Sequence, residues 1–178
     1  MNHITLLTLC TLTLGLTACD QTKMETGTPA PGGASATAML KTGTGMDAGR
    51  ATATEVKGGV RFTLDASNVP AGIHGVHIHM IGRCDAPDFT TAGGHWNPTH
   101  RQHGSLNPQG PHEGDMPNMT VGNDGRGTLG VVIPGATMAG LLDADGSAIV
   151  IHAQADDLKT DPSGNSGGRI ACGVFQAN

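Results

Sequence analysis

The segment from Gly72 to His79 reads Gly-Ile-His-Gly-Val-His-Ile-His, and it constrains this chain more than any other segment. Side chains alternate between the two faces of a strand, so His77 and His79 should share one face while Ile78 points to the other. Two neighbouring imidazoles on one face form a chelating pair, because histidine is the commonest metal-ligating side chain. A hydrogen-bonded pair lining a half-buried strand is the alternative. The chain has nine histidines in all, which favours metal binding.

From about residue 34 the chain is a succession of short alternating segments separated by glycine-containing turns. In the clearest one, Val60, Phe62 and Leu64 alternate with polar residues, and Gly58-Gly59 before it is typical of a hairpin turn. No segment has a sustained apolar period of 3.6 residues, so very little helix is expected. The expected strands cover residues 36–41, 52–56, 60–65, 72–79, 119–121, 128–133, 147–152 and 169–175. They predict an all-β fold, an eight-stranded antiparallel Greek-key sandwich or flattened barrel.

The amino terminus is typical of an exported protein. Residues 1–18 carry no Lys, Arg, Asp or Glu, and their apolar run is too short to span a bilayer as a permanent helix. Leu16-Thr17-Ala18-Cys19 resembles a bacterial lipobox, which predicts a signal peptide over residues 1–18 and Cys19 as the lipidated first residue of the mature protein. An ordinary signal peptide that leaves Cys19 as a free thiol is the alternative. A lipid anchor at Cys19 would hold the protein to a membrane on the periplasmic side of the bacterial envelope.

The rest of the composition describes one domain behind a linker. Residues 19–34 are rich in Thr, Gly, Pro and Ala and should form a flexible linker, which leaves residues 35–178 as the folded domain. The net charge is −5 with no basic cluster, so nucleic acid is not expected as a partner. Cys84 and Cys172 remain as one disulfide or as two free thiols. Export to an oxidising compartment favours the disulfide, which would contribute about 4 kcal/mol in the chain-entropy model.

Two long loops, residues 82–117 and residues 156–168, interrupt the strand pattern. The first contains His95, His103, His112 and Asp115 at the spacing H-x7-H-x8-H-x2-D, which matches a four-coordinate zinc site. A loop with this much Gly, Pro and Asn would be ordered by such a metal. A solvated histidine-rich loop is the alternative, and it accounts less well for these ligands beside the histidine strand.

Taken together, motifs spread through residues 34–176 resemble those of the copper–zinc superoxide dismutases. The motifs are Gly72 to His79, Gly93-Gly94-His95 with Asn97-Pro98, His103-Gly104, His112 with Gly114-Asp115, Ile151-His152 with Ala155-Asp156-Asp157, and Gly164-Asn165 with Arg169 to Val174. The resemblance implies one copper and one zinc ion per subunit. It implies copper ligation by His77, His79, His95 and His152, and zinc ligation by His95, His103, His112 and Asp115. His95 would then bridge the two metals.

The resemblance also implies roles for residues outside the ligand sets. Asp156 would accept hydrogen bonds from His77 and His103, and His74 would brace the loops without binding metal. Cys84 and Cys172 would form the disulfide, and Arg169 would guide the anionic substrate to copper, with Lys159 as a further candidate for steering. Bacterial relatives include monomers and dimers, so a homodimer is possible.

The implied activity is the conversion of superoxide to dioxygen and hydrogen peroxide, with Arg169 and His95 as catalytic residues. Copper would cycle between Cu(II) and Cu(I), and zinc, which has no redox chemistry in proteins, would hold His95 in place. A copper-only variant is disfavoured by the zinc-loop ligands. A non-catalytic copper carrier on the same fold is the main alternative, although this chain keeps all four copper ligands and Arg169.

Overall fold

The computed structural model describes residues 33–178; the predicted signal peptide, Cys19 and most of the predicted linker lie outside the described residues. The strands are β1 (Ser35–Thr42), β2 (Asp47–Val56), β3 (Gly59–Ala66), β4 (Gly72–His74), β5 (Val76–His79), β6 (Met119–Val121), β7 (Gly127–Pro134), β8 (Ala148–His152), β9 (Arg169–Val174) and β10 (Gln176–Ala177). Helix within residues 33–178 is limited to η1 (Thr90–Ala92) and α1 (Met138–Leu141), which confirms the expected all-β class. None of these helices is long and apolar enough to cross a membrane.

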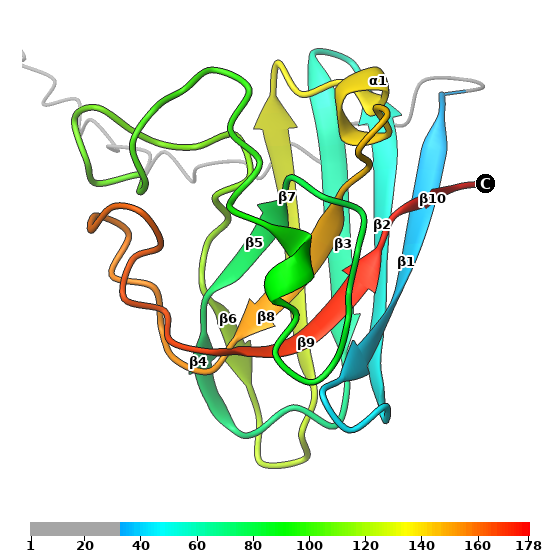
Figure 1. Ribbon diagram of the computed structural model, residues 1–178, viewed down its shortest axis with the longest axis vertical. Coiled ribbons are helices and arrows are strands. Elements are labelled where there is room, and N and C mark those ends of the chain that lie inside the picture. The colour runs from blue at the N-terminus through cyan, green and yellow to red at the C-terminus, as the bar shows by residue number, and fades with distance from the viewer. Residues whose placement is uncertain (1–32) are drawn as a thin grey trace, which may run out of the picture.

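All the strand pairs are antiparallel and form one strongly curved sheet (Figure 1). Its order is β4-β6-β7-β3-β2-β1-β9-β8-β5, with β10 paired to β1. The two ends of this order, β4 and β5, are consecutive in the chain, so the sheet curls into a nearly closed, flattened barrel. The connection from β3 to β4 crosses one end of the barrel, as in a Greek key.

The sheet has more strands than the eight expected, because two expected strands are each divided. The histidine segment divides at Gly75: β4 pairs with β6, whereas β5 pairs with β8. Gly75 itself donates its N–H to the Gln154 carbonyl oxygen at 2.8 Å, and its own carbonyl accepts from the His152 N–H at 2.9 Å. The carboxyl-terminal segment divides at Phe175, after which β10 pairs with β1. Periodicity cannot reveal either change of partner, because the alternation of side chains continues through it.

The core of the barrel follows the expected alternation. Val60, Phe62 and Leu64 of β3 are buried, and Phe62 packs edge-on against Phe175 with ring centroids 5.8 Å apart. In β5 and β8, by contrast, every residue is buried. One face of these two strands lines the barrel core, and the long loops cover the other face. The histidines of β5 therefore lie in a closed space between sheet and loops.

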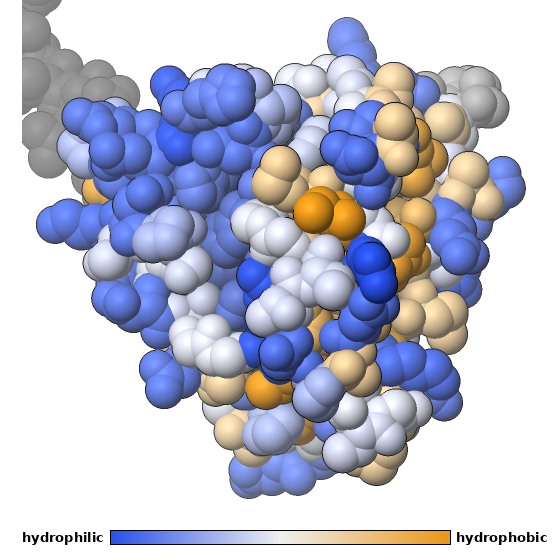
Figure 2. Space-filling view, viewed as in Figure 1, coloured by the Kyte–Doolittle hydropathy of each residue, from blue (hydrophilic) through white to orange (hydrophobic). Residues whose placement is uncertain are grey.

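Both long loops lie on the same side of the barrel, the first drawn in green and the second in orange (Figure 1). The surface over these loops is mostly hydrophilic (Figure 2). The predicted disulfide between Cys84 and Cys172 is present and ties the first loop to β9, with Cα atoms 5.7 Å apart. Backbone hydrogen bonds join the loops to each other as well, since the N–H of Leu106 donates to the carbonyl oxygen of Leu158 at 2.9 Å.

Candidate metal centre

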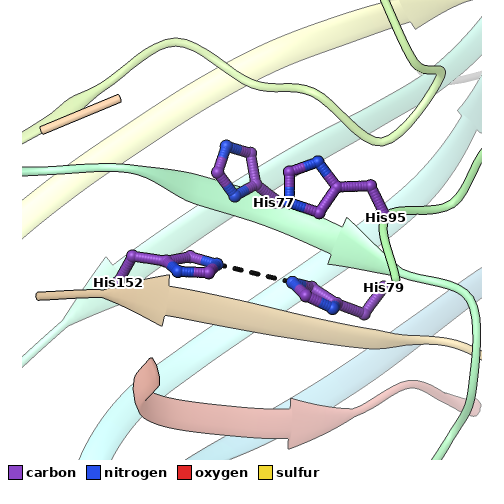
Figure 3. A group of neighbouring side chains, drawn as sticks. All are labelled: His77, His79, His95 and His152. Carbon is purple, nitrogen blue, oxygen red and sulfur yellow. Dashed lines mark hydrogen bonds between the residues drawn. The ribbon is translucent and has the colours of Figure 1, made fainter. Parts of the chain in front are cut away.

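Four imidazoles face one another between β5, β8 and the start of the first loop (Figure 3). His77 and His79 come from β5, His152 from the end of β8, and His95 from the loop. One nitrogen from each ring lies within 4.8 Å of the other three, and all four side chains are buried. The structure thus brings together the four predicted copper ligands.

The outward-facing nitrogen of three of these rings is held by the protein. His77 Nε2 lies 2.8 Å from Asp156 Oδ2, His79 Nδ1 lies 2.9 Å from the Gly93 carbonyl oxygen, and His152 Nδ1 lies 3.2 Å from the Gly167 carbonyl oxygen. Each acceptor keeps the proton on the outer nitrogen, which leaves the inner nitrogen with a free lone pair. The rings are therefore oriented and in the tautomer that a metal requires.

Two inner nitrogens carry the strongest indication of a ligand. Among the described residues, His77 Nδ1 and His95 Nε2 are the buried side-chain nitrogen or oxygen atoms with no hydrogen-bond partner. A buried polar atom without a partner costs about 1–3 kcal/mol. His79 Nε2 and His152 Nε2, 3.4 Å apart, face the same space. A copper ion, for which imidazole is a suitable ligand, would satisfy all four nitrogens at once.

A second set of ligands meets on the other side of the His95 ring. Asp115 Oδ1 lies 2.9 Å from His95 Nδ1, 3.0 Å from His103 Nδ1 and 3.3 Å from His112 Nδ1. His112 Nδ1 also lies 3.3 Å from His95 Nδ1. Ligands at 2.0–2.1 Å around a tetrahedral zinc ion are about 3.3 Å from one another. The separations in this set are close to that value, so the residues present fit zinc.

By distance alone, His77 can also be grouped with His95, His103 and Asp115, in place of His112. We assign His112 to this set because its Nδ1 contacts both Asp115 and His95, whereas His77 Nε2 is occupied by Asp156. The free nitrogen of His77 remains for the four-histidine set. The rings of His77 and His95 stack with centroids 3.9 Å apart, which explains the proximity.

Asp156 connects the two sets from outside. Its Oδ2 accepts from His77 Nε2, and its Oδ1 lies 3.0 Å from His103 Nε2. Burial opposes ionisation of this carboxyl group, but its contacts with His103 and His77 hold the pKa of Asp156 well below its usual range. Asp156 is therefore an anion that can orient one histidine of each set.

The two sets differ in the proton affinity of their imidazoles. Burial lowers the pKa of His95 to about 4 and that of His152 to about 3, so both rings are neutral at neutral pH. Burial also opposes protonation of His103, but its contacts with Asp115 and Asp156 prevail and raise the pKa of His103 to about 9. The four-histidine set is ready to bind metal near pH 7, whereas the set around Asp115 must release a proton first.

A cavity of about 490 Å³ opens onto the four-histidine set. Arg169 is the one Lys or Arg side chain among the described residues that line it, together with His79, His95 and His152. Its guanidinium donates to the carbonyl oxygens of Phe89 and Gly93, both at 2.6 Å. These contacts hold a half-buried cation beside the histidines. Lys159 does not line the cavity, and His100, which the sequence left without a role, does.

His74 lies apart from both ligand sets. Its Nδ1 is 2.7 Å from the His152 carbonyl oxygen and its Nε2 is 2.8 Å from the Pro70 carbonyl oxygen, so it braces two loops through the backbone. The sequence analysis missed Asn118, whose side chain bonds both the carbonyl oxygen and the N–H of Asp156 at 2.8 Å. No sequence signal marked it, because Asn118 and Asp156 are 38 positions apart.

Comparison with known proteins agrees with this geometry. The family described as copper/zinc superoxide dismutase (SODC) matches residues 47–175. The chain is 45% identical over 138 residues to copper–zinc superoxide dismutase 1 of Aquifex aeolicus, a match that covers 74% of this chain and 82% of the relative. It is 44% identical over 149 residues to the copper–zinc superoxide dismutase of Caulobacter vibrioides, covering 80% and 86%.

A solved structure shares the fold. The structure of a superoxide dismutase-like protein from Bacillus subtilis superposes with a TM-score of 0.75 at 39% identity, covering 79% of this chain and 97% of that one. The family match spans more than half of the chain and includes every residue of the two ligand sets, so this chain belongs to the copper/zinc superoxide dismutase family.

Proposed function

We propose that the protein is a superoxide dismutase that holds copper on His77, His79, His95 and His152, and zinc on His95, His103, His112 and Asp115. The observation that carries the proposal is the position of the His95 ring. Its Nε2 is buried and unpartnered in the four-histidine set, while its Nδ1 lies 2.9 Å from Asp115 in the other set. One imidazole shared by a redox-capable site and a redox-inert site suits a reaction that transfers both electrons and protons.

The overall reaction converts two superoxide anions and two protons to dioxygen and hydrogen peroxide. Copper supplies one-electron redox chemistry when bound, and zinc supplies a fixed positive charge without redox change. Arg169 attracts the anion and docks it, because a guanidinium stays charged and donates in a fixed fork. A positive charge at the end of a cavity raises the rate of encounter with an anion even on a net-acidic protein.

His95 supplies the proton chemistry at its Nε2 atom. This nitrogen faces the cavity side of the site, so it can take up a proton and give it up as superoxide is reduced to hydrogen peroxide. Its Nδ1, held on the Asp115 side, keeps the ring in place while the proton moves. Asp156 keeps the neighbouring His77 ring oriented throughout.

The test is to purify the protein, measure its copper and zinc, and assay superoxide removal. Near-equal amounts of the two metals with high activity are expected. His152→Ala should abolish activity and keep zinc, because His152 belongs to the four-histidine set alone. A metal-loaded wild-type protein without activity would contradict the proposal and favour a copper carrier. Light scattering on the same sample tests the proposed homodimer.

We also propose export and membrane attachment through Cys19, with residues 1–18 as the cleaved signal and residues 19–34 as the tether. The proposal rests on the sequence Leu16-Thr17-Ala18-Cys19. The protein would then remove superoxide at the periplasmic side of the cell envelope. Cys19→Ser should move the protein from the membrane fraction to the soluble fraction, and an unchanged membrane fraction would refute the anchor.

A further inference from the structure

A second carboxylate from the 156–168 loop reaches the proposed zinc ligands. Asp161 Oδ1 accepts a hydrogen bond of 2.6 Å from the backbone N–H of His103, a residue 58 positions earlier in the chain. The bond fixes the backbone of a ligand whose own ring lies between Asp115 and Asp156. It therefore acts on the place from which the His103 ring enters the site.

The same oxygen atom faces a second ligand. His112 Nε2 lies 3.7 Å from Asp161 Oδ1, while His112 Nδ1 points to Asp115. At this distance the contact is electrostatic and not a hydrogen bond. A carboxylate beside the outer nitrogen of a ligating histidine favours the tautomer with the proton on that nitrogen, which leaves the inner nitrogen free for metal.

The position of Asp161 is defined by contacts on either side of it. Leu106 donates its N–H to the Leu158 carbonyl oxygen at 2.9 Å, and Asn107 Nδ2 donates to the Lys159 carbonyl oxygen at 3.2 Å. These bonds hold the second loop along the zinc-binding part of the first loop. The side chain of Asp161 is 48% exposed, so its charge can be changed without opening the core.

We propose that Asp161 is a positioning residue for zinc, which fixes the backbone of His103 and the ring tautomer of His112. The inference rests on the zinc site proposed above. Asp156 orients His77 and His103 and thus acts on both ligand sets, whereas Asp161 contacts only ligands of the zinc set. Loss of its charge should therefore weaken zinc binding and leave the copper ligands in place.

The test is zinc affinity, measured by competition between the purified protein and a chromophoric zinc chelator. Asp161→Asn keeps an oxygen that can accept from the His103 N–H but removes the negative charge beside His112. It should weaken zinc binding by roughly 10–100-fold, the usual effect of removing an outer carboxylate partner. The visible spectrum of Co²⁺ bound in place of zinc should change as well, because that spectrum reports the ligand geometry. Asp161→Glu, which retains the charge, should recover part of the affinity.

Asp157→Asn is the matched control. Asp157 lies in the same loop, but its carboxylate accepts only from Lys159, Thr160 and Asn165 of that loop. Asp157→Asn should bind zinc as the wild type does. Equal loss in both variants would overturn the proposal, because the effect would then come from loop order.

The remaining outcomes also decide. Zinc affinity of Asp161→Asn within twofold of the wild type would overturn the positioning role while leaving the zinc site intact. A wild-type protein that binds neither zinc nor Co²⁺ would instead remove the proposed zinc site itself. If Asp161→Asn does not fold, Asp161→Ala carries the same comparison with Asp157→Ala.

Discussion

His77 Nε2 lies 2.8 Å from Asp156 Oδ2, although the two residues are 79 positions apart, and both side chains are fully buried. The other oxygen of the same carboxylate lies 3.0 Å from His103 Nε2. One buried anion thus orients a histidine in each ligand set. Neither ring has another side-chain partner for that nitrogen among the described residues, so both depend on Asp156.

Asp156→Asn should weaken both metal sites. An amide can accept a hydrogen bond through only one of its two ends, so one of the two rings loses its acceptor and its preferred tautomer. We expect metal affinity to fall by roughly 10–100-fold. Dialysis against a chelator, with copper and zinc measured over time, checks this. Asp124→Asn, at an exposed hairpin whose carboxylate accepts from the Arg126 N–H, should retain both metals. Wild-type retention in the Asp156 variant would contradict the bridging role.

Arg169→Gln should slow the reaction with superoxide at the encounter step. Arg169 is the one permanent cation among the described residues lining the cavity, and its removal should lower kcat/KM by roughly tenfold or more. The rate should also depend less on ionic strength, because salt screens the attraction that Arg169 supplies. Pulse radiolysis at several salt concentrations measures both effects. Arg169→Lys keeps the charge but not the fork that binds the Phe89 and Gly93 carbonyl oxygens, so an intermediate rate is expected.

Zinc binding to the copper-free protein should strengthen as the pH rises towards 9. The pKa of His103 is raised to about 9, so at lower pH a proton occupies the ring and competes with zinc. Release of one proton changes the apparent affinity about tenfold per pH unit. Titration calorimetry in buffers of different ionisation enthalpy counts the released protons. A zinc affinity that is constant between pH 6 and pH 8 would show that His103 is already neutral.

Gly164→Ala should destabilise the loop that carries Asp156. Gly164 has φ of +61°, and a Cβ there would collide with the Asp156 carboxylate and the His103 ring. We expect a loss of roughly 1–3 kcal/mol in the free energy of unfolding, with faster zinc release. Gly168→Ala is the control in the same loop, since a Cβ at Gly168 meets no atom within 4 Å. Thermal unfolding of the two variants should separate them, and equal melting temperatures would refute the collision.

Much of the fold could be predicted from local patterns. The alternation of Val60, Phe62 and Leu64 follows from the two-residue repeat of a strand, and the same repeat places His77 and His79 side by side. The structure confirms the strand class, the two long loops and the Cys84–Cys172 disulfide. The division of the histidine segment at Gly75 could not be predicted, because it is a change of strand partner without a break in alternation.

The candidate site divides in the same way. Spacing and residue type by themselves determined the ligand types and the number of histidines, because imidazole and carboxylate chemistry is local to each side chain. Only the tertiary structure decided which atoms meet. It placed His112 Nδ1 beside Asp115, seated Arg169 on two backbone carbonyls, and brought Asn118 and Asp161 to the ligands. Those contacts join residues far apart in the chain and depend on how the loops pack against the barrel, which no local repeat encodes.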